Sequence, residues 1–451
     1  KFKIKDLIPS DGSLLAEKMY ALLAVDYGGN KVYKRISSFD ETLYKETEEK
    51  WKSFANFLPT YEVKPGMNTD QARGYNYRYW VDFFNSRQRL CLSILLDSIL
   101  KIEDKKIRNQ FLCLFSSTLE FNNTFCSFKG EGTGAIRPIF SNHILKPERT
   151  PIENSIWGSS QGSGTFASLY RSRLLKAKAY LNEPFEIKLD GDNKAQRVVA
   201  SLPITPALYS TWPSFSKSLK TSKALILNGD SAYLPLPDES VDYVVTDPPY
   251  FDFINYSELG DFFYAWLSPI LKDKYSYFRQ DSSRRDNEVQ HQDASAFGAL
   301  LGRVFKEVHR VLAPNGKLAF SFHHSKIYGW KAVMQAIQNA QLYIVDVFPV
   351  HAELMASTPK AASKEPISID AIIVCSKNTS SLSLETAEQK CIKYADVLFS
   401  VKRSVSRGDI FVVCSAIAMS VTCELSFEDV VNQLVNSLTR RYYPDSVPTL
   451  L

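Results

Sequence analysis

The sequence predicts an α/β core flanked by mainly helical regions, and three observations lead to this prediction. From about Ala224, short apolar runs alternate with amphipathic stretches, which is the pattern of strands connected by helices. Before about residue 125, apolar side chains recur at helical spacing, and they do so again beyond a Ser/Thr-rich linker that begins at Asn378. The length of 451 residues fits two or three domains.

The pattern divides the chain into four regions. We expect a mainly helical N-terminal region, an irregular basic segment, an α/β core and a helical C-terminal region, over residues 1–125, 126–220, 221–377 and 378–451. In the first region, the spacing of Leu14, Leu15, Met19, Leu22 and Leu23 predicts one helix, and a second is expected from Phe39 to Phe54. In the second region, residues 128–168 are rich in Gly, Ser and Pro, and a helix is expected over 167–180.

The α/β core contains five strand candidates and two helix candidates. The apolar runs predict strands over residues 224–227, 241–246, 317–322, 343–348 and 369–375. Helical periodicity predicts helices over residues 296–311 and 330–339. His323 and His324 follow the third of these strands, where they are either a packed pair or part of a cleft at the sheet edge.

Composition and cysteine usage exclude several classes of protein. Hydrophobic residues make up 45% and charged residues 23%, which excludes a disordered chain or a coiled coil. The 7 Cys form no CxxC pair and the 6 His show no zinc-ligand spacing, so we expect no metal site. Unpaired cysteines in apolar stretches are typical of a cytoplasmic protein. The most apolar run, 411–423, is too short to span a bilayer, and we expect no membrane association.

The sharpest motif is Asp247-Pro248-Pro249-Tyr250, directly after the expected strand 241–246. Ligands of α/β sheets bind beyond the carboxyl ends of strands, which is where this tetrapeptide falls. The two prolines lack N–H donors and stiffen the backbone, so their carbonyls remain acceptors beside the Asp247 carboxylate. Two such acceptors can hold the two hydrogens of an exocyclic amino group, and Tyr250 can stack on a base removed from the duplex. The set suits methyl transfer to a base amino group, assisted by orientation and electrostatics.

These residues resemble motif IV of the amino-methyltransferases that act on adenine N6 or cytosine N4. The upstream stretch Ile226-Leu227-Asn228-Gly229-Asp230-Ser231 and the downstream stretch from Val311 to Leu318 resemble flanking motifs of that family. The run from Asn255 to Leu267 is similar to large adenine-specific DNA methylases of prokaryotic phage-defence loci. The resemblance implies a Rossmann-like methyltransferase sheet with helices on both faces, and DNA methylation within restriction-modification or antiviral defence.

The resemblance also assigns residues to functions. It implies that Asp247, Pro248, Pro249 and Tyr250 are catalytic, and that S-adenosylmethionine is the cofactor. It implies cofactor contacts for Asn228, Asp230 and Ser231. Arg87 and Gln88, in an FxxRQ element that begins at Phe84, either contact the cofactor or belong to an ordinary capped helix.

A glycine-rich first motif after a buried strand, which such enzymes need for the cofactor, has no clear counterpart. The nearest match, 128–134, follows a stretch with little strand character, so a flexible loop near nucleic acid is favoured over a cofactor loop. One hypothesis is therefore a split enzyme, in which a second polypeptide carries that motif. Other proteins of a defence system are further candidate partners.

The net charge of +5 is concentrated in one segment. The window 137–180 has an excess of five positive charges, which equals the excess of the whole chain. We expect it to contact the DNA backbone, with a solvated helix as the competing interpretation. Its candidate contacts are Arg137, Arg149, Arg171, Arg173, Lys176 and Lys178.

Three functions are compatible with these residues. The first is a DNA amino-methyltransferase, with adenine favoured over cytosine because Asp opens the motif in relatives that act on adenine. The second is an RNA base methyltransferase, and the third is a nucleic-acid-binding module that keeps the fold without methylating. The recognition sequence and the oligomeric state cannot be predicted from the sequence.

Overall fold

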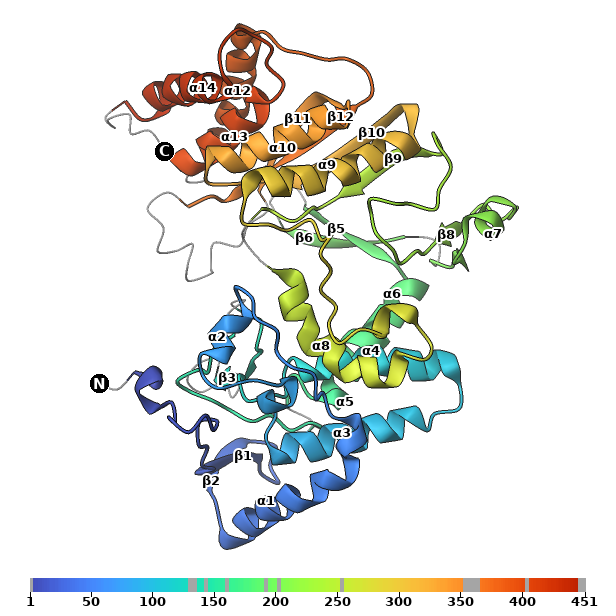
Figure 1. Ribbon diagram of the computed structural model, residues 1–451, viewed down its shortest axis with the longest axis vertical. Coiled ribbons are helices and arrows are strands. Elements are labelled where there is room, and N and C mark those ends of the chain that lie inside the picture. Colours follow the sequence, from blue (N-terminus) through green and yellow to red (C-terminus); the bar gives the residue numbers. More distant parts are fainter. Residues whose placement is uncertain are drawn as a thin grey trace. The chain divides into compact units, whose positions relative to one another are not determined.

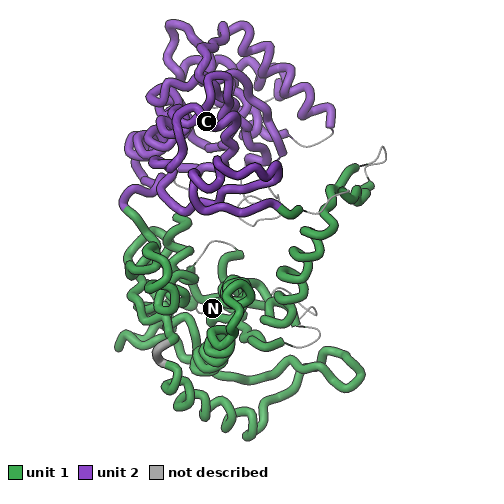
Figure 2. Tube along the Cα trace, turned by 90° about the vertical axis from the view of Figure 1, so that its right-hand side faces the viewer, with its two compact units in different colours: residues 1–205, 255–285 green, residues 206–254, 286–451 purple. Residues whose placement is uncertain are grey.

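The structure, a computed structural model, separates the chain into two compact units (Figure 2). It describes residues 3–128, 136–141, 145–158, 162–189, 194–200, 204–251, 255–351, 366–401 and 405–444. Unit 1 comprises residues 1–205 and 255–285, and unit 2 comprises residues 206–254 and 286–451. The chain therefore leaves unit 2 shortly after the Asp-Pro-Pro-Tyr motif and returns to it thirty-one residues later.

Unit 2 is an α/β unit (Figure 1). Its described elements are β7 (Ala207–Tyr209), α7 (Trp212–Ser216), β8 (Lys223–Leu225), β9 (Val241–Thr246), α9 (Ala294–Val311), β10 (Leu312–Phe322), α10 (Ile327–Asn339), β11 (Tyr343–His351), β12 (Ile369–Ser376), α12 (Leu384–Ser400), α13 (Arg407–Ala418) and α14 (Phe427–Tyr442). The strand predicted over 241–246 is confirmed at both ends, and helices α12, α13 and α14 follow the sheet in the C-terminal part of the chain.

The main sheet of unit 2 is small and mixed. Its strand order is β11-β12-β10-β9, and β7 and β8 form a separate parallel pair. Strand β9 runs parallel to β10, with Val244 opposite Leu318, whereas β12 is antiparallel to both of its neighbours. The α/β class is thus confirmed, and the sheet among the described residues is small and mixed. The Rossmann-like sheet with helices on both faces, which the resemblance implies, stays a prediction.

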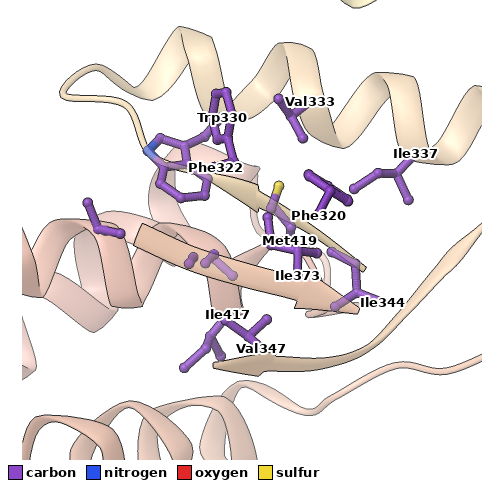
Figure 3. Close-up of a cluster of buried hydrophobic side chains, with 14 of the residues drawn as sticks. Phe320, Phe322, Trp330, Val333, Ile337, Ile344, Val347, Ile373, Ile417 and Met419 are labelled. Atoms are coloured by element: carbon purple, nitrogen blue, oxygen red, sulfur yellow. The ribbon is translucent and has the colours of Figure 1, made fainter. Parts of the chain in front are cut away.

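The core of unit 2 lies between the sheet and its helices. Figure 3 shows Trp330, Val333 and Ile337 of α10 beside Phe320 and Phe322 of β10, and all five side chains are at most 3% exposed. Helices α9 and α10 approach closely at Gly298, where an added Cβ would lie 2.9 Å from the Ala332 carbonyl oxygen. This packing fixes β10, and through it β9, as a rigid base for the residues that follow the strands.

Unit 1 is mainly helical. Its described elements are the 3-10 helices η1 (Ile4–Leu7), η2 (Trp51–Phe57), η3 (Trp80–Phe83) and η5 (Ser276–Phe278), the α-helices α1 (Ser38–Lys50), α2 (Thr69–Arg73), α3 (Ser86–Leu100), α4 (Lys105–Leu119), α5 (Phe166–Leu169), α6 (Lys176–Asn182) and α8 (Tyr256–Leu271), the π-helix η4 (Tyr170–Leu175), and the strands β1 (Ala21–Val25), β2 (Lys31–Arg35), β3 (Ser127–Phe128), β4 (Ile136–Arg137), β5 (Phe185–Leu189) and β6 (Ala195–Val199). The helix predicted over 167–180 is confirmed as part of the α5–η4–α6 run.

The predicted helix through Leu14 to Leu23 is wrong. Residues 21–25 form strand β1, which pairs antiparallel with β2 across a turn in which the Asp26 carboxylate accepts the Asn30 N–H at 2.7 Å. The turn residues Gly28, Gly29 and Asn30 favour a hairpin, and adjacent leucines fit a strand as well as a helix.

An aromatic core holds α8 within unit 1. Phe262 of α8 stacks on Phe84 with ring centroids 5.5 Å apart, and Trp266 meets Phe84 and Phe115 edge-on at 5.2 and 5.6 Å. Phe262 and Trp266 are fully buried. Helix α8 is therefore an integral part of unit 1, although its sequence follows the motif of unit 2. Among the described residues, no helix is both long and apolar enough to cross a membrane.

Candidate active site

The Asp-Pro-Pro-Tyr motif lies directly beyond the carboxyl end of β9, as predicted. Because β9 and β10 run parallel, the motif lies beside the end of β10, where Ser321, Phe322 and His323 follow one another. The Ser321 hydroxyl donates a hydrogen bond to Asp247 Oδ1. Asp247 is exposed and Pro248 is buried, so the structure fixes the backbone and leaves the carboxylate accessible.

Tyr250 is half-buried and anchored by its hydroxyl group. The Tyr250 O–H donates to Asp370 Oδ2 at 3.2 Å, and Asp370 Oδ1 lies 2.5 Å from His323 Nδ1. The Tyr250 ring meets the His323 ring edge-on, with centroids 4.9 Å apart. Burial raises the pKa of the Tyr250 phenol well above its ordinary range, and the Asp370 carboxylate adds to the rise although the Ser321 hydroxyl opposes it. The phenol therefore keeps its proton and acts as a donor.

The residue after the motif has a strained backbone. Phe251 has a φ of 59°, in the left-handed region that bulky side chains avoid. Its ring is 2% exposed and packs against Phe297, His324 and Tyr328 at centroid distances of 5.2 to 5.6 Å. The packing offsets the strain and turns the chain sharply after Tyr250, a combination that is common at functional sites.

The predicted cofactor residues of unit 2 follow β8. The carboxylate of Asp230 accepts the Ala232 N–H at 2.9 Å and the side-chain amide of Asn287. Asn228 and Ser231 are exposed. A carboxylate acceptor in a turn after a short strand fits a hydrogen bond to the hydroxyl or amino groups of a nucleoside, although its oxygens already have protein partners.

Arg310 holds the segment between these residues and β9. Its guanidinium donates to the Leu234 and Leu236 carbonyls at 3.0 and 2.9 Å and pairs with Glu307 and Asp238 at 2.6 Å each. The sequence did not indicate this function for Arg310, nor the functions of Ser321 and Asp370. The only sequence signal for Asp370 was its place in an apolar strand, where a carboxylate needs a partner.

Glu258 and Asp261, the acidic residues of helix α8, have hydrogen-bond and ion-pair partners within unit 1. Glu258 accepts the backbone N–H groups of Met67, Asn68 and Thr69 at 3.1, 2.7 and 3.1 Å. Asp261 accepts hydrogen bonds from Ser282 and Ser283 and forms an ion pair with Arg284 at 3.3 Å. Both carboxylates are under 9% exposed, which explains why acidic side chains occur in an otherwise apolar helix.

Arg87 and Gln88 lie in unit 1, at the start of α3. Arg87 Nε donates to Glu153 at 2.6 Å, and Gln88 forms a capping box with Asn85. Gln88 is 1% exposed. These contacts match a capped helix, and the structure does not bring the two residues together with Asp247 in one unit.

The predicted basic contacts also lie in unit 1. Arg149, Arg171, Lys176 and Lys178 are exposed, and Arg137 is partly exposed on β4. Arg173 lies 3.7 Å from Glu120 and covers the Phe121 ring at 5.6 Å. The glycine-rich stretch 128–134 falls almost wholly outside the described residues. Within the described part of the chain, no group of three His, Cys, Asp or Glu side chains could hold a metal ion.

The arrangement has the acceptors for an amino group. Asp247 offers an accessible carboxylate, the backbone at the two prolines has no N–H to donate, and Tyr250 presents an aromatic ring at a fixed position. The chemistry suits a planar base with an exocyclic amine.

Comparison with known proteins supports this interpretation. Residues 241–445 match the model of a family described as DNA methylase, which comprises N6 and N4 methyltransferases. Among solved structures, the PvuII DNA methyltransferase (cytosine-N4-specific) is similar at 15% identity, over 46% of this chain and 91% of that chain, with a TM-score of 0.21. No curated protein matches the chain. Over residues 241–445, this chain thus carries the N6/N4 DNA methylase family match, with the Asp-Pro-Pro-Tyr motif near its start.

Proposed function

We propose that this chain transfers a methyl group from S-adenosylmethionine to an exocyclic amino group of a base in DNA, with adenine N6 favoured over cytosine N4. The observation that supports this most directly is the exposed Asp247 carboxylate on a rigid Pro-Pro backbone at the end of β9. The family match over 241–445 favours the same chemistry. The preference for adenine rests on Asp as the first residue of the motif.

In this proposal each residue of the motif has its own function. Asp247 and the Pro248 carbonyl accept the two amino hydrogens of the base, which turns the nitrogen lone pair toward the methyl donor. Ser321 donates to the other side of the Asp247 carboxylate and so orients it. Tyr250 stacks on the extruded base.

The cofactor supplies an electrophilic methyl group on sulfur when bound. Asp230, after β8, fits a contact with the adenosine part because its carboxylate can accept hydrogen bonds. The glycine-rich segment for the methionine part stays unassigned, and we propose that a second polypeptide supplies it. Calorimetric titration of this chain with S-adenosylmethionine tests the proposal, since tight binding by the chain alone would contradict it.

The decisive experiment measures transfer of radiolabelled methyl groups to duplex DNA and to RNA. Asp247→Ala should lower kcat/KM about 100- to 1,000-fold, comparable to the loss of one preorganised electrostatic contact. Asp242→Ala is the matched control, because Asp242 is an exposed aspartate within β9, the strand that leads into the motif. Unchanged transfer by Asp247→Ala would refute the mechanism. Transfer to RNA alone would identify the RNA enzyme, and binding without transfer in the presence of the second polypeptide would identify the non-catalytic module.

The helical run α5–η4–α6, which carries four of the predicted basic contacts, provides a separate test of DNA binding. Each phosphate contact contributes roughly 0.9 to the slope of log K against log salt. Neutralising Arg171, Arg173, Lys176 and Lys178 should therefore flatten the slope by about 3, because Arg173 already has Glu120 as a partner. Arg173→Gln alone should change the slope little. An unchanged slope in the fourfold variant would assign this helix to the solvated surface.

A further inference from the structure

A buried pair of titratable side chains lies behind Tyr250 and has no place in the mechanism above. His323 follows the last residue of β10, and Asp370 is the second residue of β12; they are 6% and 8% exposed. Phe322 is paired with Ala371 in the antiparallel register, so the residues beyond them, His323 and Asp370, meet across the strands. The sheet itself therefore brings this pair together.

Asp370 uses one oxygen for each neighbour. Its Oδ1 is bonded to His323 Nδ1 at 2.5 Å, and its Oδ2 accepts the Tyr250 O–H at 3.2 Å. A buried carboxylate is costly unless both oxygens are satisfied, so the position of Asp370 is determined by its partners, and that of Tyr250 by Asp370.

Ring contacts also restrict the movement of the Tyr250 side chain where it packs against the rest of the protein. The His323 ring meets it edge-on at 4.9 Å with an interplanar angle of 86°, and Phe322 packs against it at 5.5 Å. The hydroxyl is held at one end and the ring is supported along its length. A stacking platform in a fixed position binds a flipped base without first losing side-chain freedom.

We propose that Asp370 and His323 are positioning residues that hold Tyr250 ready to stack on the target base. The inference rests on the proposed function, because it takes Tyr250 as the stacking residue. Asp370 acts through its hydrogen bond to the tyrosine hydroxyl, and His323 acts through Asp370 and by ring contact. Neither residue touches the base or the cofactor.

The test is a double-mutant cycle between Asp370→Asn and Tyr250→Phe, with methyl transfer to DNA as the readout. Each single variant should raise KM for DNA about 10-fold, the value of one hydrogen bond to a charged group, and Asp370→Asn should leave kcat nearly unchanged. The double variant should be no worse than Tyr250→Phe alone, because that substitution removes the hydroxyl on which Asp370 acts, together with its contacts to Ser321 and Asp247. Multiplied effects would overturn the inference, since Asp370 would then act without the tyrosine.

Two further measurements separate this inference from folding and from the proposed function. Asp346→Asn is the control, because Asp346 lies on the same sheet and pairs with Lys390 instead. The NMR signals of the Tyr250 ring in ¹³C-tyrosine-labelled protein should shift in Asp370→Asn and in His323→Gln, but not in Asp346→Asn. If the wild-type chain transfers no methyl group even when the second polypeptide is present, the proposed function fails, and this spectrum still decides whether the pair holds the ring. An unchanged ring signal in Asp370→Asn would refute the positioning.

Discussion

Gly66 and Glu258 test how helix α8, which follows the Asp-Pro-Pro-Tyr motif in the sequence, is attached to residues 67–69. The Glu258 carboxylate accepts three consecutive backbone N–H groups at residues 67–69, and Gly66 precedes them directly. A Cβ added at Gly66 would lie 2.5 Å from the Glu258 carboxyl group. The backbone of Gly66 is outside the left-handed region, so only the collision opposes an alanine there.

The expected loss of local opening free energy follows from these contacts. Gly66→Ala should lower this free energy by about 2 kcal/mol, because the added methyl group overpacks against the carboxylate. Glu258→Ala should cost about 3 kcal/mol, because it removes the charged acceptor of amides at the edge of the core. In the double variant the added methyl group has room, and the total should stay near 3 kcal/mol. The coupling energy is then about 2 kcal/mol in magnitude, well beyond the error expected for independent sites.

Hydrogen exchange of the peptide 64–73 measures the local opening free energy in all four proteins. Gly260→Ala is the control on the same helix as Glu258, because its added Cβ would meet nothing closer than 3.8 Å. It should be neutral or stabilise α8 slightly. Additive costs for Gly66→Ala and Glu258→Ala would refute the collision and the assigned role of the carboxylate.

Three further predictions concern stability and thiol chemistry. Asp261→Ala should destabilise unit 1 by about 3 to 5 kcal/mol in urea denaturation, because it leaves the largely buried Arg284 without its carboxylate, and a loss under 1 kcal/mol would contradict the geometry. Phe320→Ala should cost about 3 to 5 kcal/mol, measured as the loss in unfolding free energy of unit 2, because the side chain is 1% exposed and surrounded by core residues. Burial raises the pKa of the Cys126 thiol to about 12, so Cys126 should resist maleimide at pH 8 while the exposed Cys113 reacts at once. Because folding holds this proton, the thiol's contribution to stability is present below about pH 9 and is lost as the pH rises toward 12, which alkaline denaturation of Cys126→Ala beside the wild type would reveal.

Local patterns predicted those parts of the fold that depend on neighbouring residues. Strand β9 was predictable because six consecutive residues combine valines, a tyrosine and a threonine before a Pro-Pro break. The N-terminal hairpin was missed because Leu22 and Leu23 fit both periodicities, and only pairing with β2 decides between them.

The sequence predicted the residues of the Asp-Pro-Pro-Tyr motif, but not the residues elsewhere in the chain that hold the motif in place. Asp247 and Tyr250 stand in one motif, whereas Asp370 is 120 residues beyond Tyr250 and reaches it only through the pairing of β10 with β12. Glu258 and Asp261 belong to the run from Asn255 to Leu267, which in the sequence supports only the family resemblance. Their partners, at residues 67–69 for Glu258 and 282–284 for Asp261, are distant in the sequence, so the structural function of these carboxylates could not be predicted from local patterns.

The path of the chain through the two units limits how this protein can be divided. A fragment of residues 241–445 would include α8 but lack Phe84 and Phe115, against which Phe262 and Trp266 are buried. Such a fragment would expose two large aromatic side chains to water and would tend to aggregate. The segment that carries the methylase match is therefore not a module that can be moved by itself. Recombination or engineering that transplants the motif must carry the N-terminal helices with it.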